Sequence, residues 1–490
     1  MASLVGPLKS AFTRPSSNTS EEQKSEDVVQ STSVQTQADG VGELAFDEYT
    51  QGGLGRHLGI VSTAFLIVGR IIGTGIFSTP SSIVESLGSV GASLMLWVLG
   101  LFLAASASGC IIFASNIVVA ADREATEWEE RGIAIAVIVF VTLLHTFFPK
   151  LGVRGMNFIT AIKIITLLFI VVTGWVVLSG RVHRVPDPHA SFRNAFAGSV
   201  HSGNVYATAL FKVLNSYVGW SNAAYVLNEV KNPIHTLKIA GPLGLLICGI
   251  LYLLANVAYF SAATPQELAN SGSTVAAYFM FKVFGKAAER ALSVLVAISA
   301  LGNVMSITFA QARVNQELAK EGVVPFPRFW ASSWPFGSPS AGLLLHFIPS
   351  FIVIVAIPFG DAYNFIIDLE GYPSSVINFL VVLGLFYLRW AEPKIPRPFK
   401  VWWPVAAFFM AGQAFQLIAP FLRPPGGKGD TSLPYWLYAV VGIGVLLAGV
   451  VYWAVWNRLM PWVGKYKLVP QHEKLKDGTT VVVYKRVPRP

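Results

Sequence analysis

A glycine-rich stretch at residues 69–80, with the sequence GRIIGTGIFSTP, could bind an anion through its backbone. Glycines flank Thr74 and a proline follows, so a helix can unwind here at little cost and leave N–H groups unpaired. The stretch lies inside an apolar run from about residue 58 to residue 87, which is long enough to cross a bilayer. In a membrane, unpaired backbone is tolerated only where it is buried in protein or lines a cavity. We therefore expect these N–H groups to hold the negative charge of a ligand.

A second interrupted span runs from residue 205 to residue 228 and carries the polar sequence NSYVGWSN at residues 215–222. Two broken spans in one chain are a sequence-level sign of a transporter site near the middle of the bilayer. The alternative for each break is plain helix packing, because Gly69 and Gly73 form a GxxxG face and serine or asparagine side chains bond across helices. Because both breaks occur in one chain, we favour the transporter site over plain helix packing.

Lys163 lies about ten residues into an apolar run, which places it roughly 15 Å deep, close to the middle of the bilayer. An unpartnered charge there would cost on the order of 3 kcal/mol. We therefore interpret Lys163 as a functional or structural cation bound to carbonyls or hydroxyls, rather than as a lysine that snorkels to the surface.

Three acidic residues, Asp361, Asp368 and Glu370, cluster near the start of a later span. They could carry protons, but their place near the end of a helix favours an interpretation as solvated residues.

The composition excludes a soluble protein. The chain has 490 residues, of which 53% are hydrophobic and 13% charged, with a mean hydropathy of +0.56, whereas a soluble domain carries roughly 25% charged residues. The net charge of +9 comes from basic residues in short loops, so membrane topology explains it better than nucleic-acid binding. No nucleophile triad, phosphate loop or metal cluster is recognisable, so we expect no enzyme activity, no cofactor and no metal site.

The apolar runs divide the chain into three parts. Residues 1–57 are polar and predict a disordered cytosolic tail, without a cleavable signal peptide. Residues 58–460 form the transmembrane domain, and residues 461–490 are expected to be a basic cytosolic tail. After the first span, runs follow at residues 91–121, 133–148, 155–179, 205–228, 238–262, 289–311, 341–359, 364–389, 401–422 and 434–456, which makes eleven candidate spans.

The run at residues 91–121 conflicts with the basic loops that should mark the cytosolic side. Consistency requires it to cross the membrane an even number of times, yet about 31 residues cannot form two helices of roughly 20 each. The segment is therefore re-entrant, or the N-terminus is outside, or a helix pair has lost a piece. The two cysteines, Cys110 and Cys248, lie in apolar runs, so we expect no structural disulfide and no disulfide-linked heavy chain.

Several motifs together resemble amino acid permeases of the amino acid, polyamine and organocation superfamily, in its L-type branch. The resemblance covers nearly all of residues 58–460, and its motifs are IGTGIF at 72–77, EVKNP at 229–233, FAQAR at 309–313 and RPFKV at 397–401. The runs at 107–116 and 174–180 are similar to fungal high-affinity methionine permeases.

The resemblance implies an all-α integral membrane protein with a five-plus-five inverted-repeat transporter fold and two extra C-terminal helices. The family has twelve spans. Here parts of helices 2 and 3, with the loop between them, are missing, so residues 91–121 are expected to be a hybrid of these two helices and the chain to have eleven spans.

The resemblance also implies a substrate site at the two breaks. N–H groups of Gly73, Thr74 and Gly75 would bind the α-carboxylate of an amino acid, and carbonyls near Ile72 and Asn215 would bind its α-ammonium. Lys163 would stand where related proteins bind sodium and would bridge the first helix to the eighth. The expected substrate site comprises Ile72, Gly73, Thr74, Gly75, Ile76, Asn215, Tyr217, Val218, Gly219 and Ser221, and the cation site comprises Lys163, Asn303 and Ser306.

The function implied is a secondary active permease in the plasma membrane, with both termini cytosolic. It would import neutral L-amino acids, with methionine as the best candidate, by alternating access coupled to protons. Relatives have an aromatic gate where this chain has Asn215, which leaves Tyr217 or Trp220 as substitutes. The alternatives are an amino acid sensor without turnover, or a non-functional permease shortened by a gene-model error.

Overall fold

The computed structural model describes residues 59–73, 75–100, 110–123, 126–217, 219, 230–356, 359–395, 397, 399–424, 427 and 433–488. All of them belong to one compact unit, Phe46–Pro490, and the predicted tail at residues 1–57 lies outside them. Within the described residues, seven helices are long and apolar enough to cross a membrane. A pair of shorter helices, bent by 42°, makes an eighth candidate.

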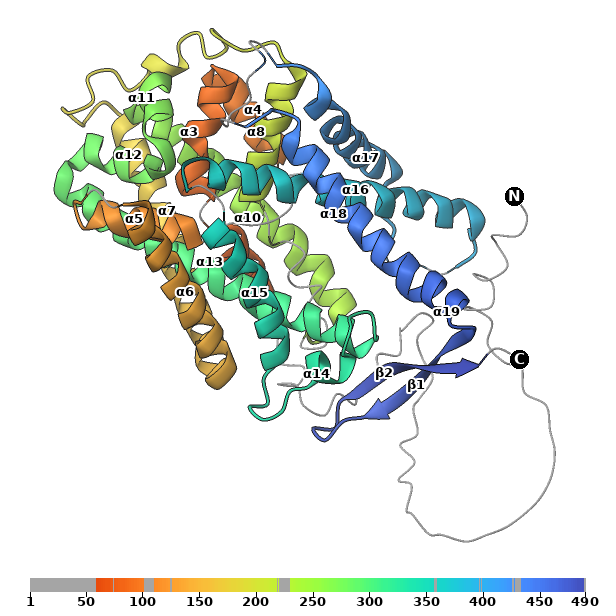
Figure 1. Cartoon of the computed structure of the whole chain (residues 1–490). Helices are drawn as coiled ribbons and strands as arrows, with labels where there is room; N and C mark the ends of the chain where they lie inside the picture. Colours follow the sequence, from red (N-terminus) through yellow and green to blue (C-terminus); the bar gives the residue numbers. More distant parts are fainter. Residues whose placement is uncertain are drawn as a thin grey trace. The chain divides into compact units, whose positions relative to one another are not determined.

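The first half of the chain supplies the following helices (Figure 1): α2 Ile60–Ile71, α3 Gly75–Leu87, α4 Val90–Gly100, α5 Cys110–Ala120, α6 Glu127–Phe147, α7 Pro149–Leu178, the short η1 Ala190–Phe192, α8 Gly203–Ser216 and α10 Pro233–Ala262. Start signals in the sequence place several of them. Thr126 and Glu129 form a reciprocal capping box at the start of α6, and a proline occupies the first turn of both α7 and α10.

The second half continues with α11 Pro265–Asn270, η3 Gly272–Thr274, α12 Val275–Phe284, α13 Lys286–Lys320, α14 Pro327–Ala331, α15 Ser340–Ala356, α16 Phe359–Ala391, α17 Trp403–Ile418, η4 Ala419–Phe421, α18 Leu437–Ala454, the π-helical turn η6 Val455–Leu459 and α19 Met460–Val463. Each of the eleven predicted apolar runs therefore contains helix. The number of membrane crossings stays a prediction, because α4, α5, α8 and α15 are shorter than a full span.

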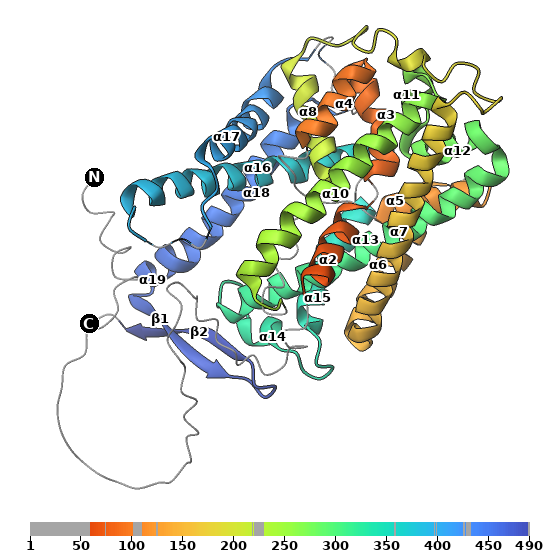
Figure 2. The same ribbon diagram turned by 180° about the vertical axis from the view of Figure 1, so that it is seen from behind.

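The centre of the molecule is formed by α2, α3, α7, α8, α10 and α13. In this group α10 packs on both α2 and α7, α3 packs on α8, and α13 packs on α7 and α2. The long α10 and α13 pass through this group in both views, whereas α16, α17 and α18 lie side by side at one flank (Figures 1 and 2). The largest fully buried side chains include Trp97, Tyr217, Tyr252 and Phe77, which lie around the breaks in the first and second interrupted spans.

Within the predicted hybrid segment at residues 91–121, the described residues form two short helices. α4 packs on α10 and α8, whereas α5 packs on α13 and α6. Each has 11 residues, about half of a bilayer crossing. The residues that join them, 101–109, lie outside the described part.

The basic C-terminal segment is folded where the structure describes it. Strands β1 Tyr466–Lys474 and β2 Thr480–Pro488 form an antiparallel hairpin, which buries Val481 against Ala319 and Ala331 near the ends of α13 and α14. The Asp477 carboxylate in the turn accepts the Ser333 N–H at 2.6 Å. Burial raises the pKa of Asp477, but the hydrogen bonds from Ser333 and Thr479 outweigh this and lower it overall.

Candidate functional site

The first break separates α2 from α3, as the glycine-rich motif predicts. α2 ends at Ile71 and α3 begins at Gly75, while Ile72 and Gly73 connect them and Thr74 lies outside the described residues. The Gly73 N–H, predicted to bind a carboxylate, donates to the Ile71 carbonyl at 2.6 Å in this structure. The first N–H groups of α3 have no partner within their own helix, because every α-helix leaves its first four donors free. These donors, at Gly75 and Ile76 among others, remain the candidates for an anion.

The glycines of the break are required because other side chains approach them closely. A Cβ atom on Gly73 would lie 2.8 Å from the amide group of Asn303 on α13. A Cβ atom on Gly75 would lie 2.3 Å from the Ser216 Oγ and 2.6 Å from the Ser216 Cα on α8. The Ser299 hydroxyl donates to the Gly73 carbonyl at 3.0 Å. The break is therefore held between α8 and α13.

Tyr252 on α10 connects the two interrupted spans. Its hydroxyl lies 2.6 Å from the Ile71 carbonyl at the end of α2 and 2.9 Å from the Ser216 carbonyl at the end of α8. One hydroxyl proton is thus shared between two carbonyls at helix C-termini, where the helix dipole is negative. No sequence pattern pointed to Tyr252, because a tyrosine within an apolar run carries no signal of its own.

The second break begins where α8 ends at Ser216. Gly219 has a φ of +125°, and a Cβ atom there would lie 2.2 Å from the Arg70 Cγ, so the two breaks are in direct contact. The Ser216 hydroxyl also lies 3.0 Å from the Thr79 hydroxyl of α3. Asn215 is half-buried, and its Oδ1 has no hydrogen-bond partner among the described atoms. The remaining predicted residues of this span, Val218 and Ser221, lie outside the described part, as does Trp220.

Three aromatic side chains pack together beside the breaks. The ring centroids of Tyr217 and Tyr252 are 5.0 Å apart, and Trp97 on α4 packs edge-on against both at 6.0 and 5.5 Å. The Tyr217 hydroxyl donates to the Trp97 carbonyl at 3.0 Å, so this ring is anchored to α4. The Trp97 indole N–H is buried without a hydrogen-bond partner among the described residues. Ile76, another residue of the expected substrate site, is also buried.

Two buried cations hold the first helix next to its break. The Lys163 ammonium group donates to the Gly69 carbonyl at 2.9 Å, and its side chain is 1% exposed. Arg70 donates to the Asn303 Oδ1 at 2.7 Å. The expected partners of Lys163 are placed differently, since Asn303 binds Arg70 and the Ser306 hydroxyl donates to Gly302 of its own helix at 2.8 Å.

Among the hydrogen bonds of the described residues, the link from the first helix to α13 therefore runs through Arg70 and Ser299 rather than through Lys163. Arg70 was not among the residues expected at the site. Its charge within a predicted span is the sequence signal that could have identified it.

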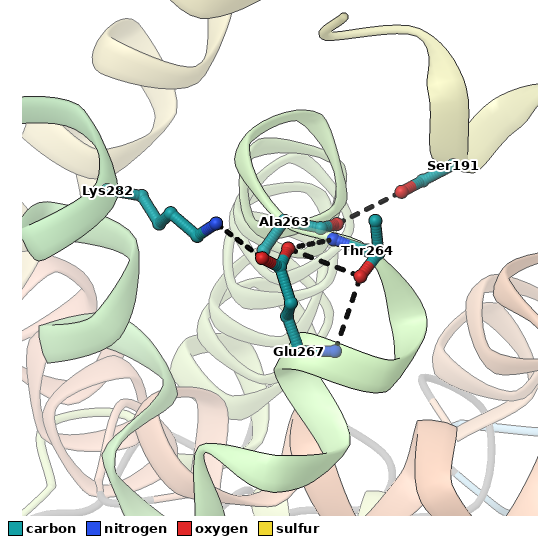
Figure 3. A network of polar contacts seen from close by, with 5 residues as sticks. All are labelled: Ser191, Ala263, Thr264, Glu267 and Lys282. Atoms are coloured by element: carbon teal, nitrogen blue, oxygen red, sulfur yellow. Dashed lines mark hydrogen bonds and ion pairs between the residues drawn. The ribbon is translucent and has the colours of Figure 1, made fainter. Parts of the chain in front are cut away.

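A cap formed by residues 263–284, which include α11 and α12, packs on α3. The Thr264 and Glu267 side chains form a capping box, and the Glu267 carboxylate also pairs with the Lys282 ammonium group (Figure 3). The Ser191 hydroxyl donates to the Ala263 carbonyl at 3.0 Å, which ties the cap to the long loop after α7 (Figure 3). Burial raises the pKa of Glu267, but its bonds to Lys282 and Thr264 outweigh this and lower it overall.

The burial of Asp368 contradicts its interpretation as a solvated residue. Its side chain is 1% exposed, and it belongs to α16, which packs against α8, α17 and α18. The side chains of Asp361 and Glu370 lie outside the described residues. In the described part of the chain, no three His, Cys, Asp or Glu residues are grouped in a way that could hold a metal ion.

Comparisons with known proteins identify the relatives of this chain. The family model described as amino acid permease matches residues 98–446. A high-affinity methionine permease of Saccharomyces cerevisiae is 38% identical over 477 residues, which cover 86% of this chain and 83% of the yeast protein. A low-affinity methionine permease of the same yeast is 28% identical and covers 93% of this chain and 92% of its own length. The b(0,+)-type amino acid transporter 1 of Oryctolagus cuniculus is 25% identical, with 83% and 89% covered.

Proposed function

The chain belongs to the amino acid permease family, and we propose that it imports neutral L-amino acids, with methionine as the first candidate, by alternating access. It is a multi-pass membrane protein and a transporter rather than an enzyme. Methionine is the first candidate because two of the relatives are methionine permeases, with 38% and 28% identity along most of this chain.

The observation that carries the proposal is the meeting of both interrupted helices at Tyr252. Its hydroxyl bonds to the carbonyls of Ile71 and Ser216, so a hydrogen-bond donor already occupies the negative ends of α2 and α8. The α-ammonium group of an amino acid is a donor of the same kind. The N-terminus of α3, which begins at Gly75, supplies the positive helix end that suits an α-carboxylate. The negative ends of α2 and α8 and the positive end of α3 thus lie together, which suits the two opposite charges of an amino acid zwitterion.

The aromatic group of Trp97, Tyr217 and Tyr252 supports a preference for neutral side chains. These rings are buried and pack against one another. A thioether sulfur gains roughly 0.3–1.5 kcal/mol against an aromatic ring, so methionine fits such a group. A charged side chain would lose its hydration against such buried rings.

The driving force is proposed to be a proton gradient. The Lys163 side chain already donates to the Gly69 carbonyl, so this carbonyl of the first helix does not need a sodium ion as its partner. We further propose a location in the plasma membrane with both termini cytosolic. We expect no disulfide-linked heavy chain, since Cys110 and Cys248 both lie in helices.

Uptake of radiolabelled methionine into cells that lack their own transport tests the proposal. We expect the chain to concentrate methionine and other neutral amino acids to compete, while arginine and glutamate compete weakly. An amino acid sensor would instead bind methionine without accumulating it, so saturable binding with no uptake would reject transport.

The shortness of α4 and α5 keeps the truncated permease as an alternative. Sequencing the transcript across codons 97 to 110 distinguishes a chain that is naturally this short from one that is shortened by a gene-model error. A longer uninterrupted reading frame would show that the present chain is shortened by a gene-model error. The same short junction, together with uptake, would show that two half-length helices suffice for transport.

A further inference from the structure

Two buried charges of opposite sign lie outside the substrate site. Asp368 on α16 and Lys212 on α8 are each 1% exposed. Burying either charge alone within a membrane is expensive, and residues of this kind are usually paired and functional. The substrate contacts proposed above use neither of them.

The packing of α16 against α8 places Asp368 on the face of α16 that is turned to α8. A Cβ atom on Gly371 of α16 would lie 2.5 Å from the Phe211 ring of α8, and Tyr372 belongs to the same buried cluster as Phe211. Asp368 precedes Gly371 and Tyr372 by three and four residues, so all three lie on one face of α16. That face is turned to α8, and Lys212 directly follows Phe211 there.

The helices that pack most closely on α16 offer Asp368 a single counter-charge. These helices are α8, α17 and α18. In the described residues, α17 and α18 contain no Asp, Glu, Lys, Arg or His, and Lys212 is the one such residue of α8. The titratable hydroxyls on these helices are Tyr206 of α8 and Tyr438 and Tyr452 of α18.

Lys212 is also linked to the substrate site. Its carbonyl accepts the Ser216 hydroxyl at 3.0 Å, one helical turn further along α8. Ser216 ends this helix, lies against Gly75 of α3, and offers its own carbonyl to Tyr252. A displacement of Lys212 relative to α16 would therefore move the end of α8 that forms the second break.

We infer that Asp368 is the proton carrier of this transporter and that Lys212 is its counter-charge, an inference that rests on the proposed function. The carboxylate takes one proton from the side on which substrate enters and becomes a neutral acid. Lys212 then loses its counter-charge, which loosens α8 from α16 while substrate is bound at the breaks. Release of the proton to the other side restores the pair.

Transport by the purified full chain in proteoliposomes tests this inference. Two measurements are needed with radiolabelled methionine: exchange against internal methionine without a pH gradient, and accumulation driven by an imposed pH gradient. With one proton per methionine, accumulation by the unmodified chain should rise by at most about tenfold for each pH unit. The matched control is Asp187→Asn, which removes a carboxylate from an exposed ion pair with Arg193 and should leave both measurements unchanged.

Asp368→Asn should retain exchange and lose the response to the gradient. The double variant Asp368→Asn, Lys212→Met buries no charge, and it provides the same test if the single variant does not fold. Exchange without gradient-driven accumulation in the double variant supports the inference. Recovery of gradient-driven accumulation in the double variant, or its retention in Asp368→Asn, would show a purely structural pair and overturn the inference.

The unmodified chain distinguishes this inference from the function on which it rests. Exchange of methionine with no response to the gradient would reject proton coupling and leave the transport function intact. Absence of both exchange and accumulation would contradict the proposed function itself.

Discussion

Helices α13 and α18 are both long and apolar enough to cross a membrane, yet they lie in opposite environments. In the most apolar part of α13, 72% of the residues are buried within the protein, whereas for the helical segment that begins with α18 the share is 11%. α13 carries Ser299 and Asn303, which bond to the first break, while α18 exposes large side chains such as Leu447 and Trp453. Hydropathy therefore identifies spans, but it does not separate helices that form the site from helices that face lipid.

The surroundings of the glycines also differ between the helices of the central group and the helices that face lipid. Gly75 in the central group has backbone and side-chain atoms of Ser216 within 2.6 Å of the position of an added Cβ atom. Gly449 in α18 has nothing within 4 Å of that position. Substitutions at these two residues give the strongest test of the comparison.

Gly75→Val should abolish methionine uptake, because the new side chain would collide with the Cα of Ser216 and separate α3 from α8. Gly449→Val should leave uptake within about twofold of the unmodified chain, since its side chain would point into open space. Uptake is measured at equal surface expression. Normal uptake by the Gly75 variant would show that the substrate site has been misplaced.

Lys163→Ala should lower uptake at least about tenfold, with a smaller loss of protein at the cell surface. The substitution removes the donor to the Gly69 carbonyl next to the break, and a buried carbonyl without its donor costs about 1–3 kcal/mol. Uptake and surface expression are compared for this variant and for Lys282→Ala, which lies in the cap. An equal loss of both quantities at Lys163 would indicate a purely structural lysine.

Tyr252→Phe should raise the KM for methionine by about fivefold or more, because one hydroxyl serves the carbonyls of both Ile71 and Ser216. Tyr452→Phe is the matched control. Its hydroxyl lies 3.4 Å from the Val323 carbonyl at an exposed position on α18, so its loss should change uptake by less than twofold. Equal effects of the two substitutions would show that the Tyr252 hydroxyl in the central helix group matters no more for uptake than the exposed Tyr452 hydroxyl on α18.

Glu267→Gln in the cap should have the smallest effect, about 0.2–1 kcal/mol of stability, because the Glu267–Lys282 pair is partly exposed. The folded pKa of Glu267 is lowered from its ordinary 4.5, so its contribution is present above pH 4.5 and is lost as the pH falls through the folded pKa. The bond to Glu267 raises the pKa of Lys282 above its ordinary 10.5, so that contribution is lost only at higher pH.

Thermal unfolding of the detergent-solubilised protein checks this expectation. The difference between the unmodified chain and the Gln variant should be constant near neutral pH and should shrink below pH 4.5. A difference that grew on acidification would contradict the assigned pair.

The sequence was sufficient for the helices of the eleven apolar runs and for the first break. A helix in lipid must satisfy its backbone internally, so apolar runs predict helices directly, and glycines around Thr74 predict where one of them is interrupted. Motif resemblance led to the family that the comparisons identify. Lys163 was recognised as buried because its depth follows from its position in the run.

The features of the site that the sequence did not predict depend on contacts between residues that are distant in the chain. A sequence does not show that Tyr252 meets two helix ends, that Arg70 rather than Lys163 binds Asn303, or that Asp368 is buried. The folding of the cap and of the C-terminal hairpin also escaped prediction, because α11, α12 and the two strands have only 6–10 residues each and are too short to be recognised as spans.

The sequence by itself therefore determined the class of this protein and the position of the first break, because both follow from the local chemistry of the backbone in a membrane. Only the tertiary structure decided what surrounds that break. The hydrogen-bond partners and the pairing of charges depend on how the helices pack. This packing brings together residues as far apart in the chain as Arg70 and Asn303, which are separated by 233 positions.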